Sequence, residues 1–208
     1  QSKRSIKKGL IQPFLPLTIT LKNHNKFESS LKNISYIEAS AKSFSLSKDN
    51  LYSGFYINEL LVRLLSQDIH CDTLFNHYQQ TLAALSQGLT IAPQLRQFEL
   101  CLLDELGVSL DFSPVFTEDG DNVVGFYYIT EQGFVPAYHF SVPNITTPWF
   151  DKEHLKAIAE QVNAPKSRVE SNEVEHTFKL LMRHIINELL DGKPLNSRKL
   201  FVNKKNRK

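Results

Sequence analysis

Residues 51–65 read LYSGFYINELLVRLL, and from about residue 49 onward the hydrophobic pattern of the chain is helical. Residues of one stripe recur here at intervals of three and four, namely Leu51, Phe55, Asn58, Leu61 and Leu65. Leu60 and Leu64 widen this stripe. Because positions three and four apart share one face of a helix, the stretch predicts a helix with a broad buried side.

The same periodicity predicts further helices over about residues 72–88, 93–107, 151–163 and 172–191. Asp72 and Asp151 are expected to cap two of them, since a short polar side chain accepts hydrogen bonds from the first turn. Asn172 with Glu175 matches the spacing of a capping box loosely. The inward stripe of the helix after Asp72 is expected to be Leu74, Phe75, Tyr78, Leu82 and Leu85.

Strands are expected before and within this helical body. Apolar and other residues alternate over residues 15–21, and residues 27–39 offer a second, weaker run. Residues 108–150 are irregular and rich in Gly and Pro, with a short hairpin expected from 126–129 and 133–135. The expected fold class is therefore α+β, with a mostly helical body.

The N-terminal strands are too few to form a domain, since two strands alone do not make a stable sheet. The chain also begins with Gln1, and its sole methionine is Met182. We therefore expect a processed or truncated form whose preceding strands are absent from this sequence.

Length and composition restrict the class of protein. The chain has 208 residues, of which 41% are hydrophobic and 22% charged, so a disordered or fibrous chain is not expected. It has neither a long apolar run nor the apolar core of a secretory signal, so we expect no membrane association. Cys71 and Cys101 are too few for a disulfide scaffold or a four-cysteine zinc site. A reducing, cytoplasmic location is the expectation.

The charge distribution is uneven along the chain. Residues 1–48 carry a net charge of +7, residues 49–192 carry −12, and residues 193–208 carry +7. An acidic body with two basic ends suggests a polyanionic partner. The alternative is that both ends are simply solvated basic tails.

The sequence offers no convincing catalytic constellation. The seven histidines lack metal-ligand spacing and are expected to be structural or at the surface. Glu118, Asp119 and Asp121 cluster without calcium-loop spacing, and they read best as a solvated loop. A nucleic-acid enzyme using these three carboxylates with magnesium is kept as a minor alternative. The expectation is a protein that is not an enzyme.

Each basic end combines cations with small polar residues, a composition that suits contact with phosphates. The first end contains Lys3, Arg4, Lys7 and Lys8 within residues 2–9. The second, residues 193–201, adds apolar residues to its cations, so we expect it to be docked on the body.

The helix expected over residues 93–107 has a second face formed by Arg96, Leu100 and Leu103. One arginine above two leucines near a helix start could receive a short acidic peptide that ends in an apolar residue and its carboxylate. The alternative is that this helix is buried on both sides, with Arg96 at the rim.

Four separated blocks, in the same order, carry a family resemblance. They are residues 2–14 (SKRSIKKGLIQPF), 51–61 (LYSGFYINELL), 95–100 with 106–107 (LRQFEL and LG) and 192–201 (GKPLNSRKLF). The chain thereby resembles the RecO family of bacterial recombination mediators, and residues 113–165 resemble it least.

The resemblance implies an N-terminal OB-fold barrel followed by a helical domain with a small insertion. Residues 1–48 would be the C-terminal part of the barrel, residues 49–208 the helical domain, and about 108–150 the insertion. Some members of the family carry four cysteines in this insertion, whereas this chain has none there. No zinc and no other cofactor is therefore expected, and a packed Phe126–Phe134 hairpin is expected in place of the metal.

The resemblance also implies a non-catalytic function in DNA repair and recombination after DNA damage, with a cytoplasmic, nucleoid-associated location. Such proteins bind single- and double-stranded DNA, anneal strands and, with RecR, help load RecA onto strands covered by single-stranded-DNA-binding protein (SSB). They also bind the acidic C-terminal tail of SSB, for which the expected residues here are Arg96, Leu100 and Leu103. Expected DNA contacts are Lys3, Arg4, Lys7, Lys8, Lys193, Arg198 and Lys199. The alternative function is a protein–protein adaptor without physiological DNA binding.

Overall fold

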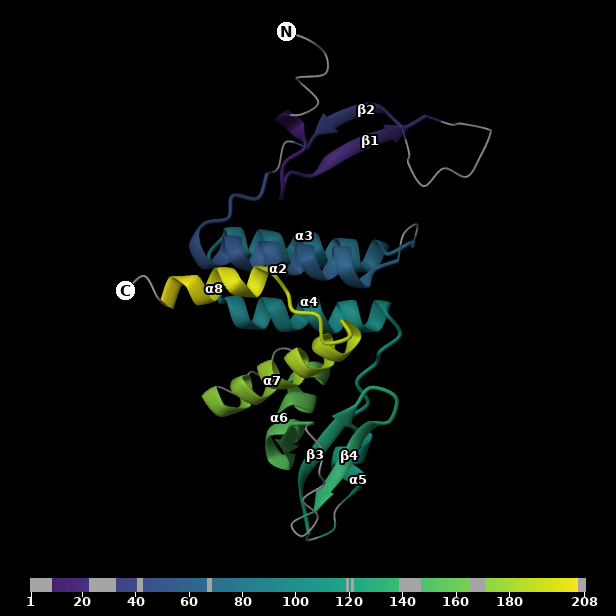
Figure 1. Ribbon diagram of the computed structural model, residues 1–208, viewed down its shortest axis with the longest axis vertical. Coiled ribbons are helices and arrows are strands. Elements are labelled where there is room, and N and C mark those ends of the chain that lie inside the picture. Colours follow the sequence, from purple (N-terminus) through teal and green to yellow (C-terminus); the bar gives the residue numbers. More distant parts are fainter. Residues whose placement is uncertain are drawn as a thin grey trace.

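A computed structural model of the chain describes residues 9–22, 33–40, 43–66, 69–118, 120, 122–138, 147–164 and 171–205. Its elements are stacked along one long axis (Figure 1). A two-stranded hairpin lies at one end, helices form the middle, and a three-stranded sheet lies at the other end. The α+β class expected from the sequence is confirmed.

The N-terminal hairpin consists of β1 (Leu17–Leu21) and β2 (Ile34–Ala39), which pair antiparallel with Ile19 opposite Ile37. Its apolar side chains are largely uncovered, and Ile19 is 49% exposed. The described residues of this region form these two strands, so the OB-fold barrel is not confirmed. The earlier part of the expected second strand lies outside the described residues.

Three helices form the upper core of the body: α2 (Lys48–Leu64), α3 (Asp72–Ser86) and α4 (Ile91–Glu105). The fully buried side chains at their contact include Ile57, Leu60, Leu82, Phe98 and Leu102. Each helix lies at the place that the sequence periodicity predicts.

The buried face of α2 is rotated relative to the predicted stripe. The most buried residues are Ser53, Gly54, Tyr56, Ile57 and Leu60, whereas the predicted stripe from Leu51 to Leu65 is only half-buried apart from Leu60. The reason is that α2 is packed against α3, α4 and a C-terminal helix on different sides.

Phe75 is a second correction to the predicted cores. It is 53% exposed and stacks on the ring of Tyr78 rather than facing inward. It lies within the first turn of α3, at the rim of the core, where solvent reaches the ring.

The predicted helix caps were right in one case of three. Asp151 caps the helix α6 (Lys152–Asn163) by accepting a hydrogen bond from the amide of His154. At α3 the N-cap position is held by Cys71 instead of Asp72. The helix α7 (Asn172–Leu189) is capped by Ser171, which lies one residue before the predicted capping box.

The lower part of the molecule is the region expected to be irregular. It contains α5 (Ser113–Thr117), β3 (Val123–Ile129), β4 (Gly133–Tyr138) and β5 (Trp149–Asp151), with the strands in the order β4-β3-β5. The predicted hairpin is thus confirmed, and Phe126 packs edge-on against Phe134. One face of this sheet packs against α6 and buries Phe126, Phe150 and Leu155 in a second core, which we call the lower core.

The basic C-terminal segment is docked on the body, as expected. Leu195 is 2% exposed, and the helix α8 (Ser197–Lys205) packs along α2. Gly192, at a φ of 70°, makes the turn between α7 and this segment, a conformation that favours glycine.

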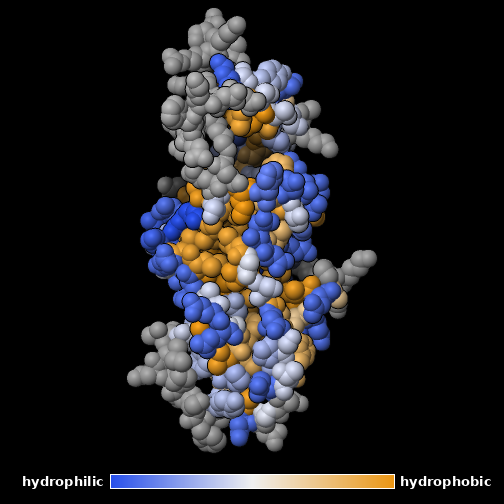
Figure 2. Space-filling model, turned by 90° about the vertical axis from the view of Figure 1, so that its right-hand side faces the viewer, coloured by the Kyte–Doolittle hydropathy of each residue, from blue (hydrophilic) through white to orange (hydrophobic). Residues whose placement is uncertain are grey.

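Figure 2 shows apolar side chains reaching the surface over the middle of the body, below the hairpin. Large hydrophobic side chains exposed on α2 and α3 include Val62, at 82%, and Phe75. Among the helices in the described residues, none has the length and apolar composition needed to cross a bilayer. The same part of the chain contains no group of His, Cys, Asp or Glu side chains arranged to bind a metal ion.

Candidate functional site

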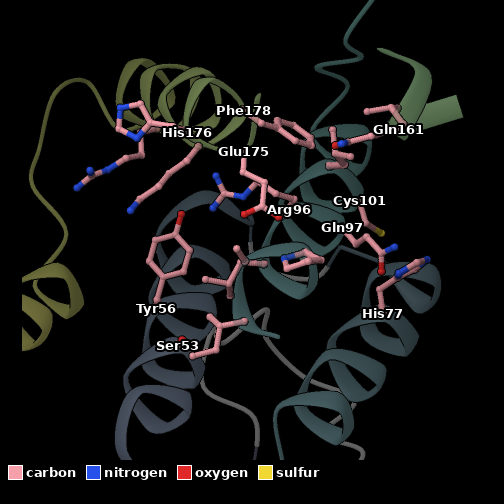
Figure 3. Close-up of a pocket in the computed structure, with 18 of the residues that line it drawn as sticks. Ser53, Tyr56, His77, Arg96, Gln97, Cys101, Gln161, Glu175, His176 and Phe178 are labelled. Atoms are coloured by element: carbon pink, nitrogen blue, oxygen red, sulfur yellow. The ribbon is translucent and has the colours of Figure 1, made fainter. Parts of the chain in front are cut away.

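A cleft of about 1520 Å³ opens between α4 and α7, with side chains of α2 and α8 at its sides. We call it the α4–α7 cleft. Figure 3 shows Arg96 near its centre, between Tyr56 of α2 and Phe178 of α7. The cations that line it are Arg96, Lys179, Arg183 and Arg198. Carboxylates also line it, namely Asp104, Glu105 and Glu175.

Arg96 is placed near the start of α4, where Pro93 occupies the first turn as the sequence predicts. Its side chain is 14% exposed, and Nη2 donates a hydrogen bond of 2.7 Å to Oε1 of Glu99. Its Nε and Nη1 atoms are buried without a hydrogen-bond partner among the described residues. The guanidinium therefore has donors that the described part of the chain leaves unused.

Glu99 lies directly beneath this arginine and is 1% exposed. The same oxygen that receives Arg96 also accepts a hydrogen bond of 2.6 Å from the hydroxyl of Tyr56. Burial raises the pKa of Glu99, although Arg96, Tyr56, Arg198 and Arg183 oppose this shift. Burial and the neighbouring carboxylate also raise the pKa of Tyr56 far above its ordinary range. Glu99 and Tyr56 thus form a buried polar centre below the cleft.

The apolar lining of the cleft includes Leu95, Leu100 and Phe178. Leu100 is half-buried and packs against the lower core, so the structure brings it and Arg96 to one cleft. Leu103 is 1% exposed and belongs to the lower core rather than to the lining.

Helix α4 therefore lies between the two cores, which are contacted by Leu102 on one side and Leu103 on the other. This position combines the two interpretations of its second face. Leu103 is buried as the alternative required, while Arg96 and Leu100 remain at an open cleft.

Sequence reasoning missed the basic side chains that α7 contributes. Lys179 and Arg183 stand four residues apart and are both exposed at the cleft. Two cations four residues apart are also common on solvated helix faces. The sequence therefore does not distinguish the lining of a cleft from an ordinary solvated face. His77 and His176 likewise line the cleft and were predicted to have structural or surface roles.

The predicted DNA-contacting cations of the second basic end, residues 193–201, are separated in the structure. Lys193 is 71% exposed in its side chain, and Lys199 is exposed on α8. Arg198 is instead half-buried and lines the cleft. The described residues do not include the four cations of the first basic end, namely Lys3, Arg4, Lys7 and Lys8. Asp119 and Asp121 also lie outside the described residues.

Comparisons with known proteins decide the family. Residues 47–199 match the family described as "Recombination protein O C terminal". The chain is 36% identical over 200 residues to a DNA repair protein RecO from Cellvibrio japonicus, covering 94% of this chain and 78% of that protein. It is 34% identical over 202 residues to a DNA repair protein RecO from Pseudomonas putida GB-1, covering 96% and 82%. The chain belongs to the RecO family.

Membership of the RecO family makes this a DNA repair protein and confirms the resemblance seen in the four sequence blocks. The RecO match runs from the start of α2 into α8. It therefore includes Arg96, Glu99 and the three further cations of the α4–α7 cleft. The cleft is thus part of the RecO-like region of the chain.

Proposed function

We propose that the chain is a non-catalytic mediator of DNA repair and recombination that binds and anneals DNA strands. In this proposal it binds the C-terminal tail of SSB and, with RecR, promotes loading of RecA. The observation that carries the proposal is the α4–α7 cleft, whose lining combines apolar side chains with four cations and three carboxylates.

The cleft suits an acidic peptide that ends in an apolar residue. Arg96 supplies a guanidinium at the centre, and Leu100 with Phe178 supplies apolar surface beside it. Lys179, Arg183 and Arg198 are available for acidic residues further along the peptide. Charge-assisted hydrogen bonds from guanidinium groups to carboxylates are among the stronger polar contacts, and water exclusion by the apolar lining strengthens them further.

DNA binding is proposed through the two basic ends of the chain. Lys193 and Lys199 project from the docked C-terminal segment, and both are exposed. Cations that neutralise phosphates on two strands reduce the repulsion between the strands, which favours annealing. The uncovered apolar side chains of the β1–β2 hairpin support the proposal that further strands complete a DNA-binding barrel there.

The roles of RecR and RecA are proposed from family resemblance. Val62 and Phe75 are large apolar side chains that are exposed on α2 and α3 and do not line the cleft, so each is available to a protein partner outside it. No step of the proposal requires a bound metal or a reacting side chain.

Annealing of complementary strands coated with SSB tests this function. We expect the protein to accelerate annealing of coated strands, and we expect little acceleration when the SSB lacks its C-terminal tail. Bare strands, which carry no SSB, serve as the control and should anneal faster when the protein is added. Tail binding without annealing of bare or coated strands would support the adaptor alternative and contradict the proposal.

A further inference from the structure

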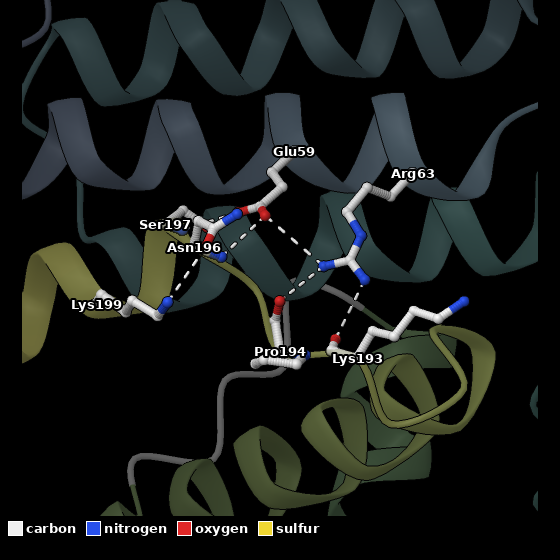
Figure 4. Close-up of polar contacts among 7 residues, drawn as sticks. All are labelled: Glu59, Arg63, Lys193, Pro194, Asn196, Ser197 and Lys199. Atoms are coloured by element: carbon white, nitrogen blue, oxygen red, sulfur yellow. Dashed lines mark hydrogen bonds and ion pairs between the residues drawn. The ribbon is translucent and has the colours of Figure 1, made fainter.

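The C-terminal helix α8 is held on the body by a carboxylate of another helix. Glu59 of α2 accepts hydrogen bonds from the backbone amides of Asn196, at 2.9 Å, and Ser197, at 2.8 Å (Figure 4). These amides lie at the N-terminus of α8, where the first turn has no partners within the helix. Glu59 therefore acts as the cap of a helix that lies about 140 residues further along the chain.

Arg63 completes this contact one turn further along α2. It donates hydrogen bonds to the carbonyl oxygens of Pro194, at 2.9 Å, and Lys193, at 3.3 Å. Its guanidinium also lies 3.7 Å from the carboxylate of Glu59. Burial favours a higher pKa for Glu59, but hydrogen bonds from Ser197 and Asn196 and the charge of Arg63 outweigh it and lower the pKa. Glu59 is thus ionised where it caps α8.

The helix that Glu59 caps carries two residues of the cleft. Arg198 is the second residue of α8, and Phe201 follows one turn later; both line the α4–α7 cleft. Phe201 also packs edge-on against Tyr52 of α2, with ring centroids 5.5 Å apart. The position of α8 along α2 therefore determines where a cation and an aromatic ring of the cleft are placed.

We propose that Glu59 is a positioning residue for the α4–α7 cleft and that it acts by fixing α8. This inference rests on the proposed binding of an acidic tail in that cleft. Glu59 does not line the cleft itself, so its effect on a ligand must pass through Arg198 and Phe201. The prediction is that a change at Glu59 lowers the affinity for the peptide although Glu59 itself does not contact the peptide.

The variant that tests this is Glu59→Gln, which keeps the size of the side chain and removes its charge. A labelled acidic peptide with an apolar C-terminal residue is titrated with each protein and followed by fluorescence anisotropy. We expect Glu59→Gln to bind more weakly than the unsubstituted protein, by up to about fivefold, because the free energy of one helix cap sets the upper limit of the effect. Hydrogen exchange at the amides of Asn196 and Ser197 should accelerate in the same variant. Glu131→Gln, which removes a charge in the exposed β3–β4 turn, is the matched control and should change neither.

A double-mutant cycle separates positioning through α8 from general destabilisation. In a protein that already carries Arg198→Ala and Phe201→Ala, the Glu59→Gln change should have no further effect on peptide affinity. If it weakens binding to the same degree in both backgrounds, Glu59 does not act through α8. If Glu59→Gln binds like the unsubstituted protein, the inference is wrong although the cleft still binds the peptide. If the unsubstituted protein does not bind, the proposed function fails and the inference fails with it.

Discussion

The guanidinium of Arg96 lies 2.7 Å from the carboxylate of Glu99, one turn further along α4, and that carboxylate is buried. The pair differs from a surface ion pair because its anion is inaccessible to solvent while its cation lies at the wall of a cleft. Leaving a buried charge without its partner is costly, so Arg96 is held in place from below. An arginine held in this way loses little further freedom when a ligand binds it.

The buried carboxylate predicts a dependence of stability on pH. Because burial raises the pKa of Glu99 in the folded protein, the folded state holds the proton more tightly than the unfolded chain. This contribution to stability is complete below the ordinary value of 4.5 and is lost as the pH rises through the raised pKa. We therefore expect Glu99→Gln, which stays neutral, to gain stability relative to the unsubstituted protein as the pH rises above 4.5.

Urea unfolding of both proteins across this pH range measures the effect. The difference in unfolding free energy should grow by up to about 1.4 kcal/mol per pH unit within the titration window. Titrations of other groups are common to both proteins and cancel in the difference. A difference that stays constant from acid to neutral pH would contradict the assignment of a raised pKa to Glu99.

The exposed lysines of the C-terminal segment predict the salt dependence of DNA binding. Changing Lys193 and Lys199 to alanine should weaken binding to single strands of any sequence, because phosphate contacts carry no sequence information. The slope of log affinity against log salt should flatten by about 0.7 for each lost contact. Lys3→Ala with Arg4→Ala tests the first basic end in the same way.

A cation that belongs to neither basic end of the sequence provides the control for these titrations. Lys156 lies on α6 and pairs with Glu153 at 2.9 Å, so Lys156→Ala should leave the salt slope unchanged. If the variants of either basic end have the same salt slope as the unsubstituted protein, the substituted residues of that end do not contact DNA.

Gly125 predicts a stability effect in the lower sheet. It lies in β3 opposite Asp151 of β5, and a Cβ atom there would overlap the carbonyl oxygen of Phe150 and the ring of Trp149. Since a backbone oxygen cannot move aside as a side chain can, Gly125→Ala should lower the free energy of unfolding by about 1–3 kcal/mol. Gly120→Ala is the control, because the nearest atom to its added Cβ is 3.9 Å away. Equal thermal stability of the two variants would contradict this packing.

The elements with long periodic patterns could be predicted from the sequence. Helices α2, α3, α4, α6 and α7 follow from apolar spacing, and Gly107, at a φ of 73°, lies where α4 was predicted to stop. Strand β5 has only three residues, too few to show a period, and it forms by pairing with β3. Its position depends on tertiary contacts that no local pattern encodes.

The candidate site could be predicted only where one helix carries it. Arg96 and Leu100 follow from the spacing on α4, whereas Lys179, Arg183 and Arg198 reach the cleft from two other helices. Glu99 was not singled out because a carboxylate three residues after an arginine is the usual pattern of an exposed helix pair. Its burial results from Tyr56 and the packing of α2 against α4, which are properties of the fold.

The most direct test of the account is the affinity of the cleft for the C-terminal tail of SSB with and without Arg96. The labelled tail peptide is titrated by fluorescence anisotropy with Glu99→Gln and with the double variant Arg96→Ala/Glu99→Gln, so that removing Arg96 does not leave the buried carboxylate of Glu99 without its partner. The account predicts saturable binding to Glu99→Gln and at least about tenfold weaker binding to the double variant. Equal affinity of the two proteins for the tail would contradict the claim that Arg96 recognises it.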